Sequence, residues 1–154
     1  MQKAVFLVVA AGAGIGLMWP SAQSPAPAHE SATEGQETLL KRQSDGHFYV
    51  DAEVNGDLVN FVVDTGATDV VLPVETARRL GIPFSESEFV VIGRGASGPV
   101  RGKAIRLDRV SVDGKEVRNI DAAIAEGLDQ PLLGQAYLSR ISSVEMSKDQ
   151  MRLQ

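Results

Sequence analysis

The segment from Phe61 to Leu72 (FVVDTGATDVVL) places a single carboxylate, Asp64, at a turn between two apolar runs. Gly66 allows the backbone to turn tightly and lets another group approach closely. Thr65 supplies a hydroxyl that can hydrogen-bond to a neighbouring chain. A carboxylate in apolar surroundings costs free energy unless it is paired or does chemistry. Asp64 is therefore the residue that we expect to carry acid–base chemistry.

The composition argues against other kinds of site. The 154 residues include no cysteine, which excludes disulfides, thiolate catalysis and cysteine-ligated zinc. His29 and His47 stand far apart, without the spacing of metal ligands. The net charge of -5 argues against nucleic acid as a partner. The glycine-rich stretch 93–102 lacks the spacing and the ending of a nucleotide-binding loop. We therefore expect no metal and no cofactor.

Residues 1–20 have the pattern of an export segment, with an uncharged apolar run from Ala4 to Trp19. The run is short for a membrane span of about 20 residues. It is slightly long for the apolar part of a signal peptide, about 7–15 residues. A cleaved signal peptide and an uncleaved membrane anchor both fit. The anchor is favoured, because the small-residue cleavage pattern at 26–28 lies well past the run.

Residues 21–44 are rich in Ser, Ala, Pro, Glu and Gln, and this composition predicts a disordered linker. The folded domain is then expected over 45–154. Strand-like runs occupy 47–54, 58–63, 70–72, 89–92, 104–112 and 117–125, a final hairpin 144–153, and short helices 73–80 and 133–141. Asn55-Gly56 and Asp113-Gly114 are hairpin turn signals. Many short strands with one or two small helices predict an all-β sandwich or barrel.

The setting of Asp64-Thr65-Gly66-Ala67, after a strand, an Asn-Gly turn and a second strand, resembles the retropepsins. Pro131-Leu132-Leu133-Gly134 resembles the element that precedes the short C-terminal helix of that family. The short motifs GHFYV, VNG, DTGAT, LLG and YLSR are most similar to those of bacterial, membrane-associated retropepsin-like proteases. The resemblance runs from about Gly46 to the C-terminus. It implies an all-β fold, a closed retropepsin-like barrel with one or two short helices, active as a two-fold homodimer.

The resemblance also implies roles for individual residues. The residues assigned to catalysis are Asp64, Thr65 and Gly66. Asp64 is the catalytic acid and base, and Thr65 supports the two aspartates across the dimer. The residues expected to bind substrate are Ala67, Thr68, Asp69, Gly95, Ala96, Ser97 and Gly98. The last four stand where the family has a glycine-rich flap that covers the substrate. Leu133 and Gly134 are expected to pack behind the active-site loop.

The sequence departs from the family at two positions. Retroviral members often carry an acidic residue where Thr68 stands and an arginine where Gln135 stands. In that family the two charged residues form a salt bridge. We expect that neutral hydrogen bonding between Thr68 and Gln135 replaces it here.

The chemistry of an aspartic protease needs two carboxylates that share one proton, one to activate water and one to polarise the scissile carbonyl. The pair titrates as a unit. This sequence has one Asp-Thr-Gly motif, so a second Asp64 has to come from a second subunit. The resemblance thus implies an aspartic endopeptidase that cleaves extended peptides. If the N-terminal segment is an uncleaved anchor, the protein would lie on the periplasmic side of the bacterial inner membrane. If that segment is a cleaved signal peptide, the protein would be free in the periplasm.

Two other interpretations stay open. The fold could serve as a catalytically inactive, dimeric peptide-binding or adaptor module. Alternatively, Asp64 could be a satisfied turn residue of an exported β-domain. The intact Asp-Thr-Gly-Ala motif argues against the adaptor, because a binding module has no need of a costly carboxylate.

Overall fold

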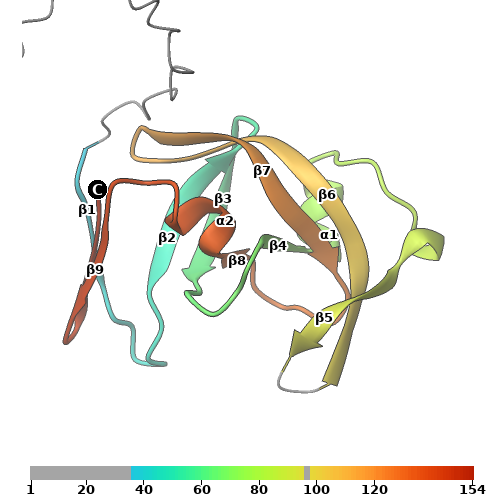
Figure 1. Cartoon of the computed structure of the whole chain (residues 1–154), viewed down its shortest axis with the longest axis horizontal. Helices are drawn as coiled ribbons and strands as arrows, with labels where there is room; N and C mark the ends of the chain where they lie inside the picture. The colour runs from blue at the N-terminus through green and yellow to red at the C-terminus, as the bar shows by residue number, and fades with distance from the viewer. Residues whose placement is uncertain (1–35, 96–97) are drawn as a thin grey trace, which may run out of the picture.

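The structure, a computed structural model, describes residues 36–95 and 98–154. Strands make up most of the regular structure in this part of the chain (Figure 1). They are β1 (Thr38–Lys41), β2 (Tyr49–Val54), β3 (Asp57–Val63), β4 (Val70–Pro73), β5 (Val90–Gly95), β6 (Gly98–Val112), β7 (Lys115–Ala125), β8 (Leu132–Leu133), β9 (Val144–Ser147) and β10 (Gln150–Leu153). The helical segments are α1 (Val74–Arg79), the 3-10 turn η1 (Glu86–Glu88) and α2 (Gln135–Leu138). The predicted all-β fold with two short helices is confirmed.

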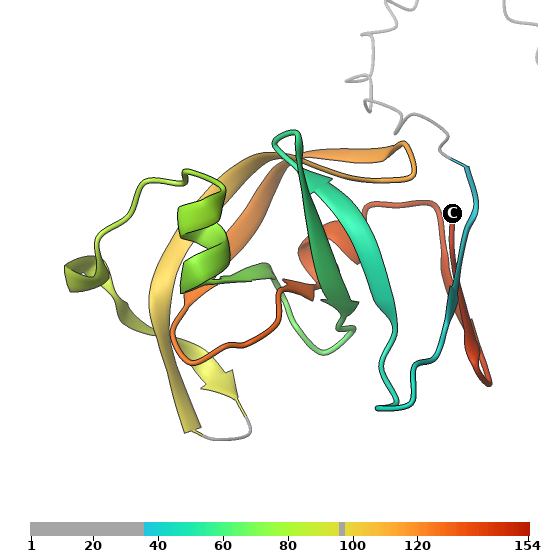
Figure 2. The ribbon, with the colours of Figure 1, turned by 180° about the vertical axis from the view of Figure 1, so that it is seen from behind.

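The main sheet has seven strands in the order β2-β3-β8-β4-β7-β6-β5. One end strand, β2, also pairs with β6, the neighbour of the other end strand β5, through Glu53–Ser111 and Val54–Val110. The sheet therefore curls back on itself over two residue pairs, and the long β6–β7 hairpin arches over the other strands (Figure 2). The short β8 lies between β3 and β4, which places the ends of three central strands side by side.

Both predicted hairpin turns are present. Asn55 and Gly56 join β2 to β3 with φ angles of 53° and 106°, and Asp113 and Gly114 join β6 to β7 with 46° and 82°. Two successive positive φ angles are required by the type I′ turn, whose backbone twist matches the twist of the paired strands. The tight turns fix the register, and the register decides which residues enter the core.

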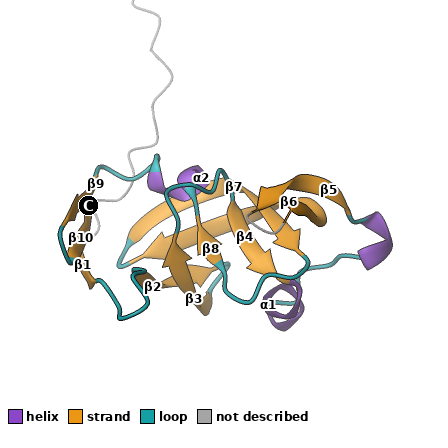
Figure 3. Ribbon diagram, turned by 90° about the horizontal axis from the view of Figure 1, so that it is seen from below, coloured by secondary structure: helices purple, strands orange, loops and turns teal. Residues whose placement is uncertain are grey.

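The two helices lie on opposite sides of the strands (Figure 3). Helix α1 agrees with the prediction for 73–80, with Pro73 as its N-cap and Ala77 fully buried. Helix α2 is shorter than the predicted 133–141. It begins only after Gly134, because Leu132 and Leu133 form β8 and pair with β3.

A second sheet of three strands, in the order β1-β10-β9, joins the two ends of the domain. Leu40 of β1 lies opposite Met151 of β10, and both side chains are buried. The prediction of a disordered linker through residue 44 is therefore wrong for its last part. The strand was missed because its hydrogen-bond partner is the C-terminal strand, which local composition does not reveal.

A buried lysine fixes the first part of β1. Lys115, only 2% exposed, donates hydrogen bonds to the carbonyl oxygen of Gln36 and to Thr38 Oγ1. The Thr38 hydroxyl in turn donates to Asp113 Oδ2 at 2.5 Å. Burial lowers the pKa of Lys115, while the Asp113 charge opposes this shift. The start of the domain is thus tied to the β6–β7 turn.

The predicted export segment 1–20 and the linker up to residue 35 lie outside the described residues. Within 36–95 and 98–154, no helix is long and apolar enough to span a membrane.

We predict that a fragment of residues 36–154 is more stable than one of residues 45–154. The shorter fragment lacks β1, exposes an edge of β10 and loses the burial of Leu40, which alone stabilises the fold by about 2 kcal/mol. Chemical denaturation of the two fragments measures the difference. Equal free energies of unfolding would contradict the assignment of β1 to the domain.

Candidate active site

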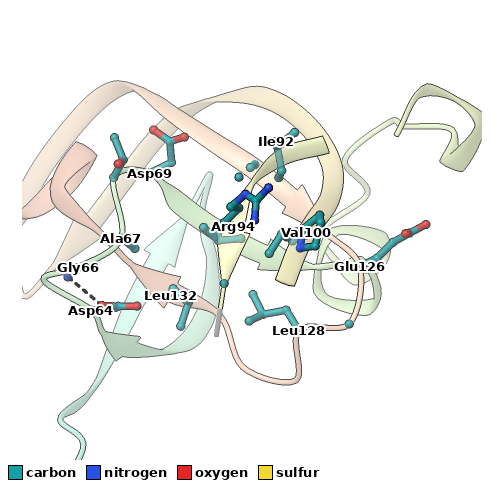
Figure 4. A pocket seen from close by; sticks show the side chains of 18 of the residues that line it. Asp64, Gly66, Ala67, Asp69, Ile92, Arg94, Val100, Glu126, Leu128 and Leu132 are labelled. Atoms are coloured by element: carbon teal, nitrogen blue, oxygen red, sulfur yellow. Dashed lines mark hydrogen bonds between the residues drawn. The ribbon is translucent and has the colours of Figure 1, made fainter. Parts of the chain in front are cut away.

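Asp64 lies at the end of β3, in the loop that leads to β4. The strands on either side anchor this loop, because Phe61 and Val70 are fully buried. The Asp64 amide donates to the carbonyl oxygen of Leu133 at 3.1 Å. The Asp64 side chain is half-buried, and its Oδ1 accepts a hydrogen bond from the amide of Gly66 at 2.9 Å (Figure 4). The turn itself therefore holds the carboxylate in place.

Gly134 packs directly behind this loop. A methyl group at Gly134 would lie 2.2 Å from the carbonyl oxygen of Asp69 and 2.7 Å from that of Ala67. Both distances are far below van der Waals contact, so only glycine allows the two backbones to approach this closely. Leu133, beside it, is fully buried. The structure thus places Leu133 and Gly134 behind the active-site loop, where the sequence predicts them.

The first amides of α2 also bind the loop. The amide of Gln135 donates to the carbonyl oxygen of Ala67 at 2.9 Å, and the amide of Ala136 to that of Thr68 at 2.7 Å. These amides belong to the first turn of a helix, which has no acceptors of its own for them. The loop and the helix start therefore satisfy each other's backbone groups.

The predicted pairing of the Thr68 and Gln135 side chains takes a different form. Gln135 does make a neutral hydrogen bond to the loop, but its Nε2 donates to the carbonyl oxygen of Thr65 at 3.0 Å. Thr68 is exposed and contacts α2 through its backbone. The expectation that the Thr68 side chain replaces a salt-bridge partner is therefore wrong, because Gln135 reaches past it to a main-chain acceptor.

Asp64 borders a cleft with a volume of about 810 Å³ (Figure 4). Of the residues that the sequence assigns to the site, the structure brings Asp64, Gly66, Ala67, Thr68, Asp69, Gly95 and Gly98 to this cleft. Thr65 is exposed and does not line it. Ala96 and Ser97 lie outside the described residues. A cleft of this size is within the range of ligand sites in proteins.

Sequence reasoning missed most of the cleft wall. The further lining residues are Val71, Ile92, Gly93, Arg94, Pro99, Val100, Ala104, Ala123, Ala125, Glu126, Gly127, Leu128 and Leu132. Ala104 lies opposite Ala123 in the β6–β7 register, so small side chains gather on one face. The alternation of β7 could have grouped Ala123 with Ala125. It could not show that their face borders the cleft, because that depends on how the sheet curls.

The curled sheet, the Asp64 loop and the backing helix α2 together define a retropepsin-like fold. Residues 50–140 match the family model described as "gag-polyprotein putative aspartyl protease". The chain belongs to this family of retropepsin-like aspartic proteases.

Solved structures agree with this assignment. A retropepsin-like aspartic protease from Rickettsia conorii is 36% identical, with a TM-score of 0.66, over 79% of this chain and 93% of that one. The protease of EIAV in complex with an inhibitor has a TM-score of 0.54 at 17% identity, over 69% of this chain and 97% of that one. The EIAV similarity concerns the fold alone.

Two curated proteins of uncharacterized function are also similar. One, from the cobV 5' region of Sinorhizobium sp., is 35% identical over 79% of this chain. The other, from Rickettsia prowazekii, is 36% identical over 80% of this chain. In both cases the match covers 53% of the relative, so the chain spans about half the length of the curated relatives it matches.

We predict that Gly134→Ala destabilises the domain by about 1–3 kcal/mol, because the added methyl group forces the Asp64 loop away from α2. Denaturant unfolding measures the loss. Gly93→Ala is the matched control, because a methyl group there meets nothing within 4 Å. Equal stability of the two variants would mean that the close approach at Gly134 is not needed.

Proposed function

We propose that this chain is an aspartic endopeptidase whose active unit is a homodimer with two Asp64 residues at its centre. The observation that carries the proposal is the position of Asp64, half-buried at the edge of a large cleft, in a loop that is hydrogen-bonded to β8 and α2. Such a rigid carboxylate suits a group that has to meet a water molecule and a substrate carbonyl in fixed geometry.

A second carboxylate has to come from outside the chain. Asp69 and Glu126 are the other acidic residues that line the cleft within the described part of the chain. Figure 4 shows the Asp69 carboxylate turned away from that of Asp64. Glu126 is paired with Arg101 at 3.3 Å. A second copy of Asp64, related by a two-fold axis, is the simplest source of the partner that the reaction needs.

The surface around Asp64 is compatible with a second subunit. Thr65, Gly66 and Thr68 are all exposed beside it. The three-stranded sheet also leaves the outer edges of β1 and β9 unpaired within the described residues. Edge strands offer free backbone groups to another chain. Leu39 on β1 and Met146 on β9 are half exposed, which adds apolar surface to these edges.

The cleft favours an extended peptide with apolar side chains as substrate. Its lining is mainly small and aliphatic, with Val71, Val100, Leu128 and Leu132 among the larger side chains. We further propose that the protein acts after export, on the periplasmic side of the inner membrane. An uncleaved N-terminal anchor would concentrate the subunits in the membrane plane and so promote dimerisation.

We predict that Asp64→Asn abolishes cleavage of an unstructured protein while the fold is kept. The amide oxygen of asparagine can still accept the Gly66 hydrogen bond, but it cannot exchange a proton with water. Asp108→Asn is the matched control and retains most of the activity, because Asp108 is an exposed aspartate on β6 that does not line the cleft. Cleavage by the Asp64→Asn variant, or equal losses in the two variants, would refute the catalytic role.

We also predict that the cleavage rate of the 36–154 fragment rises with about the square of its concentration while the monomer predominates. Two subunits have to meet to form one site. Sedimentation analysis over the same range identifies the monomer and the dimer. A strictly proportional rise in activity from a monomeric sample would contradict the homodimer.

A further inference from the structure

The β5–β6 hairpin leaves the main sheet at a defined level. The pairing of β6 with β7 ends at Gly102 opposite Ala125, so residues 98–100 pair with β5 alone. The hairpin extends beyond the other strands from this level onward (Figures 1 and 2). Ile92 forms an extra residue on β5 at the same level, because the register shifts between Val91 and Gly93. A bulge bends and twists the strand that carries it.

Arg101 lies at this level and contacts both neighbours of β6. Its Nη2 donates to the carbonyl oxygen of Phe89, just before β5, at 3.0 Å. Its Nη1 donates to Glu126 Oε2, just after β7, at 3.3 Å. The Arg101 carbonyl oxygen also accepts the Glu126 amide at 2.9 Å. One residue thus joins the base of the hairpin to the loop that follows β7.

That loop forms part of the cleft wall beside the hairpin base. Glu126, Gly127 and Leu128 line the cleft, as do Ile92 and Val100 on the hairpin side (Figure 4). A change in the angle between the hairpin base and this loop therefore changes the shape of the cleft that would hold a peptide. Gly102 packs closely against β7 at this level, because a methyl group on it would lie 2.0 Å from the Ile124 carbonyl oxygen.

We propose that Arg101 and Glu126 are a positioning pair that holds the hairpin base against the loop after β7 and so sets the shape of this part of the cleft. Neither residue acts on the reacting bond; both orient the walls that bind the substrate. The effect on cleavage rests on the proposed endopeptidase function. The effect on the hairpin base does not, because it follows from the contacts of Arg101 alone.

The pair is suited to a local role more than to overall stability. The Arg101 and Glu126 side chains are 54% and 38% exposed. An exposed ion pair contributes little to the free energy of unfolding, because water screens it. A second ion pair one step further into the sheet, Lys103 with Glu88 at 2.8 Å, stays intact when the first is removed. Loss of the Arg101–Glu126 pair should therefore loosen the hairpin base without unfolding the domain.

Glu126→Gln and Arg101→Gln test the proposal in the 36–154 fragment. We expect each to raise the KM for a peptide substrate by about threefold to tenfold with a smaller change in kcat, as the loss of a binding geometry does. Arg106→Gln is the matched control, because it removes another exposed ion pair of β6, the one between Arg106 and Asp121 on β7.

Hydrogen–deuterium exchange supplies a readout that needs no activity. We expect the amides of residues 90–95, 98, 100 and 101 to exchange at least about threefold faster in both glutamine variants, and at the wild-type rate in Arg106→Gln. Unchanged exchange in this segment, or the same change in Arg106→Gln, would overturn the positioning role. If the wild type cleaves nothing, the proposed function fails, and the exchange rates still decide the proposal about the hairpin base.

Discussion

The close approach of Gly134 to the Asp64 loop is the contact on which the site depends. It brings the backbone of β8 and the start of α2 against the carbonyl oxygens of Ala67 and Asp69. The loop then has acceptors for the amides of Gln135 and Ala136, and the Asp64 amide finds the carbonyl oxygen of Leu133. Any side chain at position 134 would separate these partners. A rigid carboxylate on a loop is possible here because the loop is bound on its backbone.

For the proposed activity, the same arrangement leaves the site incomplete in one chain. These hydrogen bonds hold Asp64, and the turn occupies one of its oxygens with the Gly66 amide. Among the described residues, no second carboxylate forms a hydrogen bond with Asp64. The exposed side of the loop and the open strand edges are where the missing group could enter. Proposed activity and proposed assembly are therefore one question, because a proton-sharing pair requires two copies of this loop.

Much of the fold follows from local signals in the sequence. Asn55-Gly56 and Asp113-Gly114 predict their hairpins because two positive φ angles restrict the residue types at such turns. The Asp64 loop and the element before α2 are also evident, since each combines glycine with buried neighbours. The features that the sequence did not reveal are set by distant partners. β1 exists because β10 binds it, and Gln135 binds Thr65 because α2 begins where Gly134 allows. The cleft walls likewise depend on how far the sheet curls.

A subunit-mixing measurement tests directly whether each active site needs an Asp64 from both subunits. A fixed amount of wild-type 36–154 fragment is incubated with increasing amounts of the Asp64→Asn fragment, at concentrations where sedimentation shows dimers. If each active site needs an Asp64 from both subunits, random pairing with a tenfold excess lowers the cleavage rate to about one tenth. Unchanged cleavage after the subunits have exchanged would show that one Asp64 suffices, and would contradict the account.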